Sequence, residues 1–380
     1  MDGFVIALKF VPKCLPIVIF KSLDHLIYWV RYLFSNFNHL AKFGNQVGKL
    51  VQERLIKFNS QSEIATIDEG SKKIMKRRKL NNNKKAPVGL YDPRNEHDAC
   101  GLGFIANIKG VKSHKIIEDG IHILENLEHR GATGADPLMG DGAGILVQIP
   151  HEFMTKKCTS LGFQLPSAFN YSLGYFFMPK DLTLQERVKS LIETIASVEG
   201  QKVIGWRKVP TNNALLSQDP EIMASEPNHW QCFFSRPCNL SDDEFERKVY
   251  VLRRQISNAV EQDLEQNDTF YSVSMSSRTL VYKGMFLADQ LKPYYADLQD
   301  PNFVSAVALV HQRFSTNTFP SWKLAHPYRM VAHNGEINTV RGNANWMTAR
   351  HANLHSELFG DDLSKIWPIS YEDKSDTARF

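Results

Sequence analysis

The residues around one cysteine suit a catalytic nucleophile. Cys100 stands in the segment DACGLGF, where Gly101, Gly103 and a hydrophobic run follow it. Glycines let other groups approach the backbone closely, and a buried strand after them would anchor the cysteine. A thiol at its reference pKa of about 8.5 is only partly ionised at neutral pH, so a catalytic cysteine needs a base.

The sequence leaves two sources for that base open. His311, His326 and His333 each follow a predicted short strand, and His333 with Asn334 would suit a thiol hydrolase of the Cys/His/Asn kind. No feature of the sequence ties one of these histidines to Cys100. Alternatively, cleavage before the cysteine would free its α-amine, whose pKa is about 7.7–8.0. That amine can take the thiol proton and later give it to a leaving amine.

The elements that would position these residues begin after Ala86, where the composition becomes that of a folded domain. Hydrophobic runs predict strands over 101–108, 144–149, 171–178, 230–234, 271–275, 279–284, 303–314 and 328–337. Helices are predicted over 113–131, from a capping box at 241–244 to about 261, and from 339 onward.

The arrangement of these elements favours one fold class. The strands 271–275 and 279–284 look like a hairpin, and most strands are neighbours rather than parts of a regular βαβ series. This pattern predicts an α+β fold with antiparallel sheets. The glycine-rich segment 140–145 lacks the spacing of a phosphate-binding loop, and we predict a turn into a strand there.

Composition excludes several classes of function. The chain has a net charge of +4, but residues 1–99 carry 17 Lys and Arg against 9 Asp and Glu, so the remainder is acidic overall. Nothing beyond the first quarter therefore favours nucleic acid as a partner. The five cysteines form no CxxC or Cys/His metal spacing, and their odd number suits free thiols in a reducing compartment. His151-Glu152 lacks the second histidine of a zinc-binding helix.

The first 88 residues are predicted to be an extension outside the folded domain. Charged residues interrupt the hydrophobic stretch 4–34, so stable membrane insertion is not expected. Its excess of basic residues could serve an organelle presequence, which leaves the cytoplasm, a mitochondrion or a plastid open as compartments. The basic segment 71–85 could be a nuclear-localisation or nucleic-acid patch, but its few apolar residues and its repelling like charges favour a disordered linker.

Six segments of the sequence are specific when they are taken together and in order. They are YDPRNEHDACGLGFIA, LEHRGATGADPLMGDGAGI, GWRKVPTNNALL, HQRFSTNT, AHPYRMVAHNGEINTVRGN and SDTARF. Together they resemble one known family, the glutamine amidotransferase domain of the large chain of glutamate synthase. The resemblance covers about residues 90–380 and implies a class II amidotransferase whose processed chain begins with a cysteine. It also implies an N-terminal-nucleophile hydrolase fold, a four-layer αββα sandwich with two antiparallel sheets.

The resemblance implies catalytic roles for four residues. Cys100 matches the nucleophile that attacks the side-chain amide carbon of glutamine. The side chain of Asn334 and the backbone N–H of Gly335 match the oxyanion hole, where one donor is typically worth about 3–4 kcal/mol. Arg130 matches an arginine that orients the N-terminal cysteine, although it would also suit the C-terminal end of its predicted helix.

Three more residues match the family's substrate contacts. Arg313 and Thr316 match residues that bind the α-carboxylate of glutamine, where an arginine offers a bidentate fork. Asp376 matches the carboxylate that pairs with the α-ammonium group of the substrate. An ordinary surface ion pair is the alternative for Arg313 and Asp376, and His326 is expected to be structural rather than catalytic.

The chain departs from the family in two ways. The 99 residues before Cys100 exceed the usual short propeptide, so we expect residues 89–99 to be the propeptide end and 1–88 to be a targeting sequence or a gene-model artefact. The domain 100–380 is expected to be incomplete at its C-terminus, a fragment without the later domains. The FMN and iron–sulfur cluster that the resemblance implies belong to those missing domains, and no cofactor is expected in the fragment itself.

The expected function is glutaminase activity through a Cys100 thioester. In the full-length enzyme the released ammonia would react with 2-oxoglutarate, and reduction would give glutamate. The expected partners are L-glutamine, the synthase domains of the same chain and an electron-donating subunit or domain. Two alternatives stay open: an inactive truncated fragment or binding module, and a Cys/His thiol hydrolase that works without processing.

Overall fold

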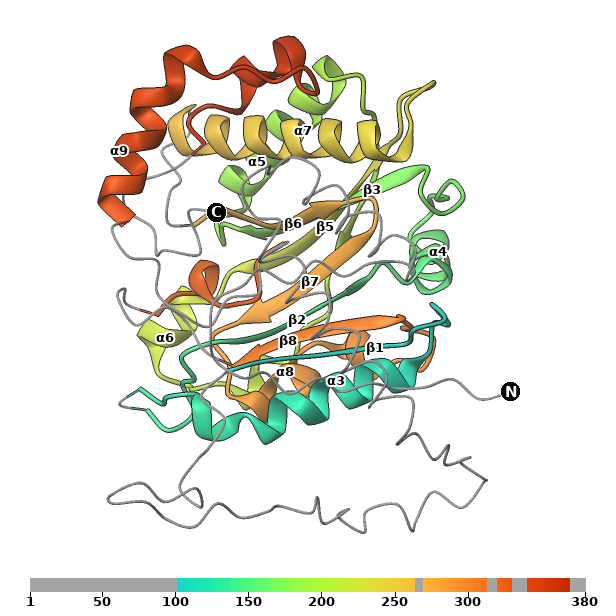
Figure 1. Cartoon of the computed structure of the whole chain (residues 1–380). Helices are drawn as coiled ribbons and strands as arrows, with labels where there is room; N and C mark the ends of the chain where they lie inside the picture. Colours follow the sequence, from blue (N-terminus) through green and yellow to red (C-terminus); the bar gives the residue numbers. More distant parts are fainter. Residues whose placement is uncertain (1–100, 135, 264–268, 313–319, 330–339, 370–380) are drawn as a thin grey trace, which may run out of the picture. The chain divides into compact units, whose positions relative to one another are not determined.

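Two antiparallel sheets of four strands each form the centre of the described chain (Figure 1). The computed structural model describes residues 101–369, apart from 135, 264–268, 313–319 and 330–339. The first sheet has the strand order β1-β8-β2-β7, and the second has the order β4-β5-β3-β6. Non-consecutive neighbours in both sheets require crossovers, so residues far apart in the sequence meet in each.

The strands agree in part with the predicted ones. In the first sheet they are β1 Leu102–Ala106, β2 Ala143–Gln148, β7 Thr279–Gly284 and β8 Val307–Gln312. In the second sheet they are β3 Tyr171–Met178, β4 Val203–Lys208, β5 Asn228–Ser235 and β6 Tyr271–Ser276. Strand β4 was not predicted, and the predicted strand 303–314 begins only at Val307. Of the predicted strand 328–337, Tyr328 and Arg329 are not in a strand, and the other residues lie outside the described ones.

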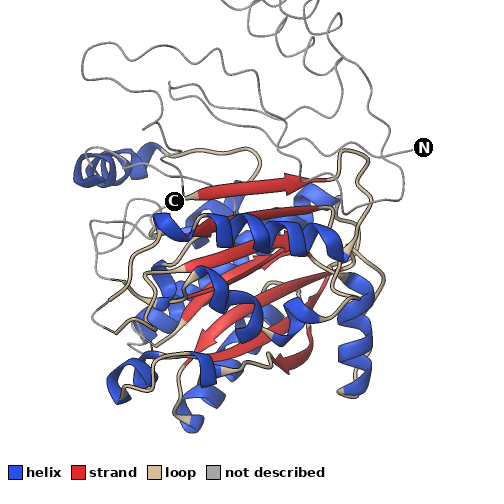
Figure 2. Ribbon diagram, turned by 90° about the horizontal axis from the view of Figure 1, so that it is seen from below, coloured by secondary structure: helices blue, strands red, loops and turns tan. Residues whose placement is uncertain are grey.

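Helices cover the outer faces of both sheets (Figures 1 and 2). Helix α3, His114–Asn126, packs on the first sheet through a buried stripe that includes Ile117, Ile121 and Leu124, as predicted. Helices α5, Leu182–Val198, and α7, Asp242–Asp263, share a hydrophobic cluster with the second sheet. The predicted α+β class is therefore confirmed, with layers in the order helix, sheet, sheet and helix.

Shorter helices fill the connections. The α-helices are α4 His151–Ser160, α6 Pro220–Ser225, α8 Leu291–Tyr294 and α9 Val340–Arg350. The 3-10 helices are η2 Glu128–Arg130, η3 Asn213–Leu215, η4 Ala288–Gln290, η5 Ala296–Gln299, η6 Trp322–Leu324, η7 His351–Asn353 and η8 Gly360–Ile366.

The predicted helix 113–131 is too long at its C-terminal end. The α-helix stops at Asn126, because the backbone of Leu127 leaves helical geometry and its N–H bonds to the Leu124 carbonyl. The next residues form the separate 3-10 turn η2, which ends before Gly131. Arg130 therefore lies in a short turn, and not in the last turn of an α-helix.

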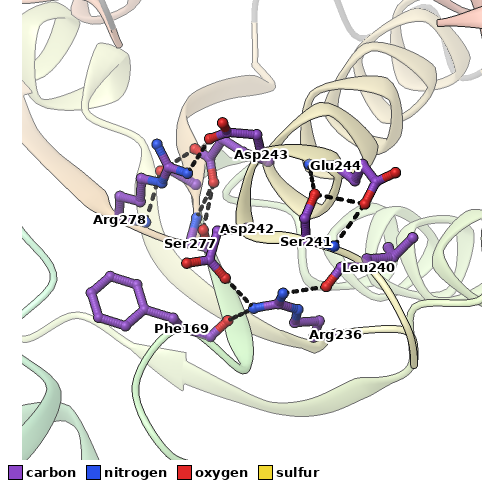
Figure 3. Close-up of polar contacts among 11 residues, drawn as sticks. Phe169, Arg236, Leu240, Ser241, Asp242, Asp243, Glu244, Ser277 and Arg278 are labelled. Atoms are coloured by element: carbon purple, nitrogen blue, oxygen red, sulfur yellow. Dashed lines mark hydrogen bonds and ion pairs between the residues drawn. The ribbon is translucent and has the colours of Figure 1, made fainter. Parts of the chain in front are cut away.

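The predicted hairpin is wrong in its pairing. Strands β6 and β7 are consecutive but belong to different sheets, β6 pairing with β3 and β7 with β2. Helix α7 stabilises the corner between them. The Glu246 carboxylate accepts hydrogen bonds from the Ser277 N–H at 2.9 Å and hydroxyl at 2.6 Å, and Asp243 pairs with Arg278 at 2.5 Å (Figure 3). These contacts give hydrogen-bond and ion-pair partners to Ser277 and Arg278, the two residues between the strands.

The start of α7 forms as its sequence predicts. The N–H and hydroxyl of Ser241 donate to the Glu244 carboxylate at 2.7 and 2.6 Å, and the Glu244 N–H reaches the Ser241 hydroxyl at 3.4 Å (Figure 3). This reciprocal arrangement is a capping box. It fixes the beginning of the helix that supports the β6–β7 corner.

A buried ion pair joins elements on the two sheets. Arg207 of β4 donates from both terminal nitrogens to Asp297 of η5, at 2.6 and 2.8 Å, and the two side chains are 4% and 2% exposed. Tyr282 of β7 donates to the same carboxylate at 2.6 Å. Gln231 of β5 accepts from Arg207 at 2.7 Å and donates to Tyr282 at 3.0 Å. Every member of the network therefore has a partner.

This network predicts a strong dependence of stability on Asp297. The substitution Asp297→Asn would leave the Arg207 charge buried without a counter-ion, which typically costs about 3–5 kcal/mol of unfolding free energy. Urea unfolding of the two proteins measures that difference. Asp119→Asn, in the exposed pair with Lys115, is the matched control and should cost less than about 1 kcal/mol. Equal losses in the two variants would contradict a structural role for the buried pair.

Candidate active site

The start of β1 and the end of β8 meet at one end of the first sheet. Leu102 lies opposite His311, and the N–H of Gln312 donates to the Gly101 carbonyl at 2.8 Å. In the sequence, Gly101 directly follows Cys100 and Gln312 directly precedes Arg313. The described neighbours of the predicted nucleophile and of a predicted substrate ligand are therefore in hydrogen-bond contact.

The turn that contains Arg130 packs against the same place. A Cβ atom on Gly131, the residue after Arg130, would come within 2.5 Å of the Gln312 side-chain nitrogen. A larger side chain at this position would force the Gln312 side chain to move. Among the seven residues named for the site, Arg130 is the one that the structure describes, and its turn lies beside Gln312. Its predicted role toward the cysteine stays a prediction.

The glycine-rich segment 140–145 is a turn into β2, as predicted. Gly142 has a φ of +136°, which favours glycine, and β2 begins at the next residue. A Cβ on Gly140 would come within 2.2 Å of the Phe286 backbone. The Asp141 N–H donates to the Ala132 carbonyl at 3.0 Å, so the segment folds back on the Arg130 turn. The glycines therefore serve close packing.

Two histidines lie together behind this end of the sheet. The rings of His311 and His326 stack with centroids 4.5 Å apart, and the two residues are 2% and 3% exposed. His326 also contacts the Tyr328 ring edge to face at 4.7 Å. The backbone of His326 also packs closely on Gly144 of β2, where an added Cβ would lie 2.4 Å from the His326 carbonyl oxygen. This packing is what the expected structural role of His326 requires.

The other residues named for the site lie outside the described ones. They are Cys100, Arg313, Thr316, Asn334, Gly335 and Asp376, together with the alternative base His333. Their assignments therefore stay predictions.

Sequence analysis did not single out Lys283, which proves to be fully buried in β7 beside this region. The sequence did hold one signal. Lys283 lies two residues after Val281 in a predicted strand, so the charged residue stands on the same face of the strand as an apolar one.

Metal binding has no candidate among the described residues, because no three His, Cys, Asp or Glu side chains gather there. The described cysteines are separate and free: Cys158 and Cys232 are buried, and Cys238 is exposed. These three cysteines do not gather as the ligands of an iron–sulfur cluster do. Within the same part of the chain, no helix combines the length and apolar character that spanning a membrane needs.

Comparison with known proteins decides the family. The profile of the family described as "Glutamine amidotransferases class-II" matches residues 100–380, so the match begins at Cys100. The chain belongs to the class II glutamine amidotransferases. It is therefore a member of an enzyme family, and the resemblance found in the sequence motifs is confirmed.

Individual relatives of this amidotransferase are glutamate synthases. It is 47% identical over 292 residues to the large chain of the NADPH glutamate synthase of Bacillus subtilis, covering 76% of this chain and 19% of the relative. The NADH glutamate synthase of Saccharomyces cerevisiae is 42% identical over 300 residues, which cover 76% and 14%. A chloroplastic ferredoxin-dependent glutamate synthase of Arabidopsis thaliana is 38% identical over 289 residues, which cover 76% and 18%. The chain thus spans less than a fifth of the length of these relatives.

Burial predicts which described thiols react. Burial raises the pKa of Cys158 to about 12 and that of Cys232 well above its ordinary value, so both stay protonated near neutral pH. In a pulse of iodoacetamide at pH 7.5, we expect alkylation of exposed Cys238 in the folded protein, and of Cys158 and Cys232 only after unfolding in urea. Peptide mass spectrometry measures all three. Equal rates for Cys158 and Cys238 in the folded protein would contradict the described packing.

Proposed function

We propose that this chain is the glutaminase part of a glutamate synthase, with Cys100 as an N-terminal nucleophile. The observation that carries the proposal is the family match that begins at Cys100. The hydrogen bond between Gly101 and Gln312 supports it, because consecutive Cα atoms are about 3.8 Å apart. Contact between Gly101 and Gln312 is therefore compatible with a site in which Cys100 and Arg313 would both reach one small substrate.

The proposed reaction has two halves. The Cys100 thiol gives its proton to its own α-amine, and the sulfur attacks the side-chain amide carbon of glutamine. The Asn334 side chain and the Gly335 N–H donate to the oxyanion that forms. The intermediate collapses as the amine returns the proton to the leaving nitrogen, so ammonia departs and a thioester remains. Water then attacks the thioester, which releases glutamate and restores the thiol.

Three residues would select glutamine over other amides. Arg313 and Thr316 would bind the α-carboxylate, and Asp376 would pair with the α-ammonium group. Both charged groups lie at the end of the substrate that does not react, so they position the amide without taking part in bond breaking. A simple primary amide would lack both contacts and should be a poor substrate.

The remaining steps of the full-length enzyme are also part of the proposal. Ammonia from this domain would pass to a synthase portion that carries FMN and an iron–sulfur cluster, and there it would be combined with 2-oxoglutarate. The relatives' names specify NADPH, NADH and ferredoxin. Since all three kinds share the region matched here, the glutaminase step is proposed to be independent of the electron donor.

Removal of the nucleophile tests the proposal. We expect Cys100→Ala to abolish glutamine-dependent ammonia release, because the proposed thioester forms on the Cys100 sulfur. Ammonia is measured in a coupled assay over time. Cys238→Ala, which removes an exposed thiol, is the matched control and should keep the activity. Ammonia release by Cys100→Ala at the wild-type rate would refute the proposal. If the wild-type protein itself releases no ammonia, the inactive fragment is favoured.

The substrate contact of Asp376 can be tested separately. We expect Asp376→Asn to raise KM for glutamine by about 10- to 100-fold, since it removes the partner of the α-ammonium group. Alkylation of the Cys100 thiol should keep nearly its ordinary rate, because the nucleophile is untouched. Both quantities are measured on the same preparation. An equal loss of glutamine turnover and thiol reactivity would mean misfolding instead of a lost contact.

A further inference from the structure

Lys283 of β7 is a fully buried cation that the proposed reaction does not use. It has 0% exposure, and its ammonium group donates to the Lys323 carbonyl at 2.9 Å. The ammonium also lies over two aromatic rings, 4.8 Å from the centroid of Tyr271 and 4.2 Å from that of Tyr328. Among the described residues, its partners are thus a carbonyl and two tyrosines, and no carboxylate contacts it.

An ammonium group in such a place has a cost that an apolar side chain would avoid. Burial disfavours the charged form, and methionine or leucine would fill a buried position without that penalty. Carbonyl oxygens and aromatic faces nevertheless attract a cation strongly when water is absent. We therefore expect the ammonium group to serve a purpose through its contacts with the Lys323 carbonyl and the two tyrosine rings.

Two of the three contacts of the Lys283 ammonium are with one segment, Trp322–Tyr328, and the third is with Tyr271 of β6. The ammonium reaches the Lys323 carbonyl and the Tyr328 ring, and the Tyr328 hydroxyl donates to the Leu324 carbonyl at 2.9 Å. The segment also packs closely on β2. A Cβ on Gly144 of β2 would lie 2.7 Å from the Lys283 Cβ and 2.4 Å from the His326 carbonyl oxygen. Lys283 thus anchors the segment to β7 and β2.

This segment connects the two parts of the chain that are proposed to handle the substrate. Arg313 and Thr316 precede it, and Asn334 and Gly335 follow it. Its side chains Trp322, Leu324 and Tyr328 are all buried, so its position is set by packing and by the Lys283 contacts. The position of the segment therefore sets where the chain before it must end and where the chain after it must begin.

We propose that Lys283 is a positioning residue, whose buried ammonium fixes the segment Trp322–Tyr328 and so aligns the carboxylate-binding residues with the oxyanion hole. The inference rests on the proposed glutaminase function and goes beyond it, since that reaction assigns no role to Lys283.

The positioning should weaken as pH rises. Burial lowers the pKa of Lys283 to about 8; Tyr271 of β6 raises it in part, and the nearby Arg329 lowers it further. Tyr328 and His326 are the other titratable groups that face this position, and Arg253 of α7 lies near Arg329 and Tyr271. As pH rises through about 8, the ammonium becomes a neutral amine, which loses the electrostatic attraction to the two rings and keeps only a weaker hydrogen bond to the carbonyl.

Substitution of Lys283 combined with a pH profile tests this role. At pH 6.5 we expect Lys283→Met to lower kcat/KM for glutamine by about 10- to 100-fold, the size that a displacement of about 1 Å can have. The ratio of wild-type to variant kcat/KM should then decrease as the pH rises, with its midpoint near the pKa of about 8, although the neutral amine still donates to the Lys323 carbonyl. Titration of the cysteine α-amine affects both proteins and cancels in the ratio.

Two further variants separate charge from packing. Lys283→Gln keeps a donor for the Lys323 carbonyl and should recover part of the activity at pH 6.5, without a change of its own near pH 8. Lys109→Met, at an exposed position after β1, is the control and should match the wild type at every pH. A ratio that stays constant with pH, or a Lys283→Met enzyme as active as wild type, would overturn the proposal.

Hydrogen exchange gives a readout that does not need glutamine. At pH 7 the peptide that covers Trp322–Tyr328 should exchange faster in Lys283→Met than in wild type, whereas a peptide from β3 should not change. If neither protein hydrolyses glutamine, the proposed function fails, but this comparison still decides whether Lys283 fixes the segment. Unchanged exchange in Trp322–Tyr328 would overturn the positioning role by itself.

Discussion

The antiparallel pairing of β1 with β8 is the constraint on which the proposed site depends. β1 is an edge strand of the first sheet, and its register with β8 brings Gly101 to Gln312. In the proposed reaction, the nucleophile becomes the first residue of its chain and no segment before it can hold it. The pairing of β1 with β8 would then hold the residue that follows the nucleophile, Gly101, beside Gln312.

The buried interactions between the sheets give this end of the molecule a rigid support. The Arg207–Asp297 pair connects β4 to the connection after β7, and Tyr282 and Gln231 complete its hydrogen bonds. A second group of rings surrounds His229, whose two nitrogens contact the hydroxyls of Tyr175 and Tyr294 at 2.7 and 2.8 Å. Fully satisfied polar networks in a low-dielectric interior favour one arrangement of the elements over others. Lys283 differs from both networks, because its charge has no carboxylate partner among the described residues, and that difference is what suggests a functional role.

Sequence patterns predicted the elements whose signals are local and missed those that depend on the rest of the fold. The capping box of α7 and the buried stripe of α3 are set by neighbouring residues, and both were predicted correctly. The pairing of β6 and β7 was not, because Glu246 and Asp243 of a distant helix satisfy the corner between the strands. Strand β4 was not predicted, because its residues are mostly half-buried and do not alternate clearly between apolar and polar. For the site, motif order identified the family, but neither the contact of Gly131 with Gln312 nor the burial of Lys283 follows from sequence alone.

The identity of the first residue of the active protein tests the central claim most directly. Protein that releases ammonia from glutamine would be purified, digested with trypsin and analysed by mass spectrometry. We predict a peptide from Cys100 to Lys109 with a free α-amine, because the proposed base exists only after cleavage before the cysteine. Recovery of the peptide from Asn95 to Lys109 as the dominant species in fully active protein would show that Cys100 is still joined to Ala99, and would contradict the account.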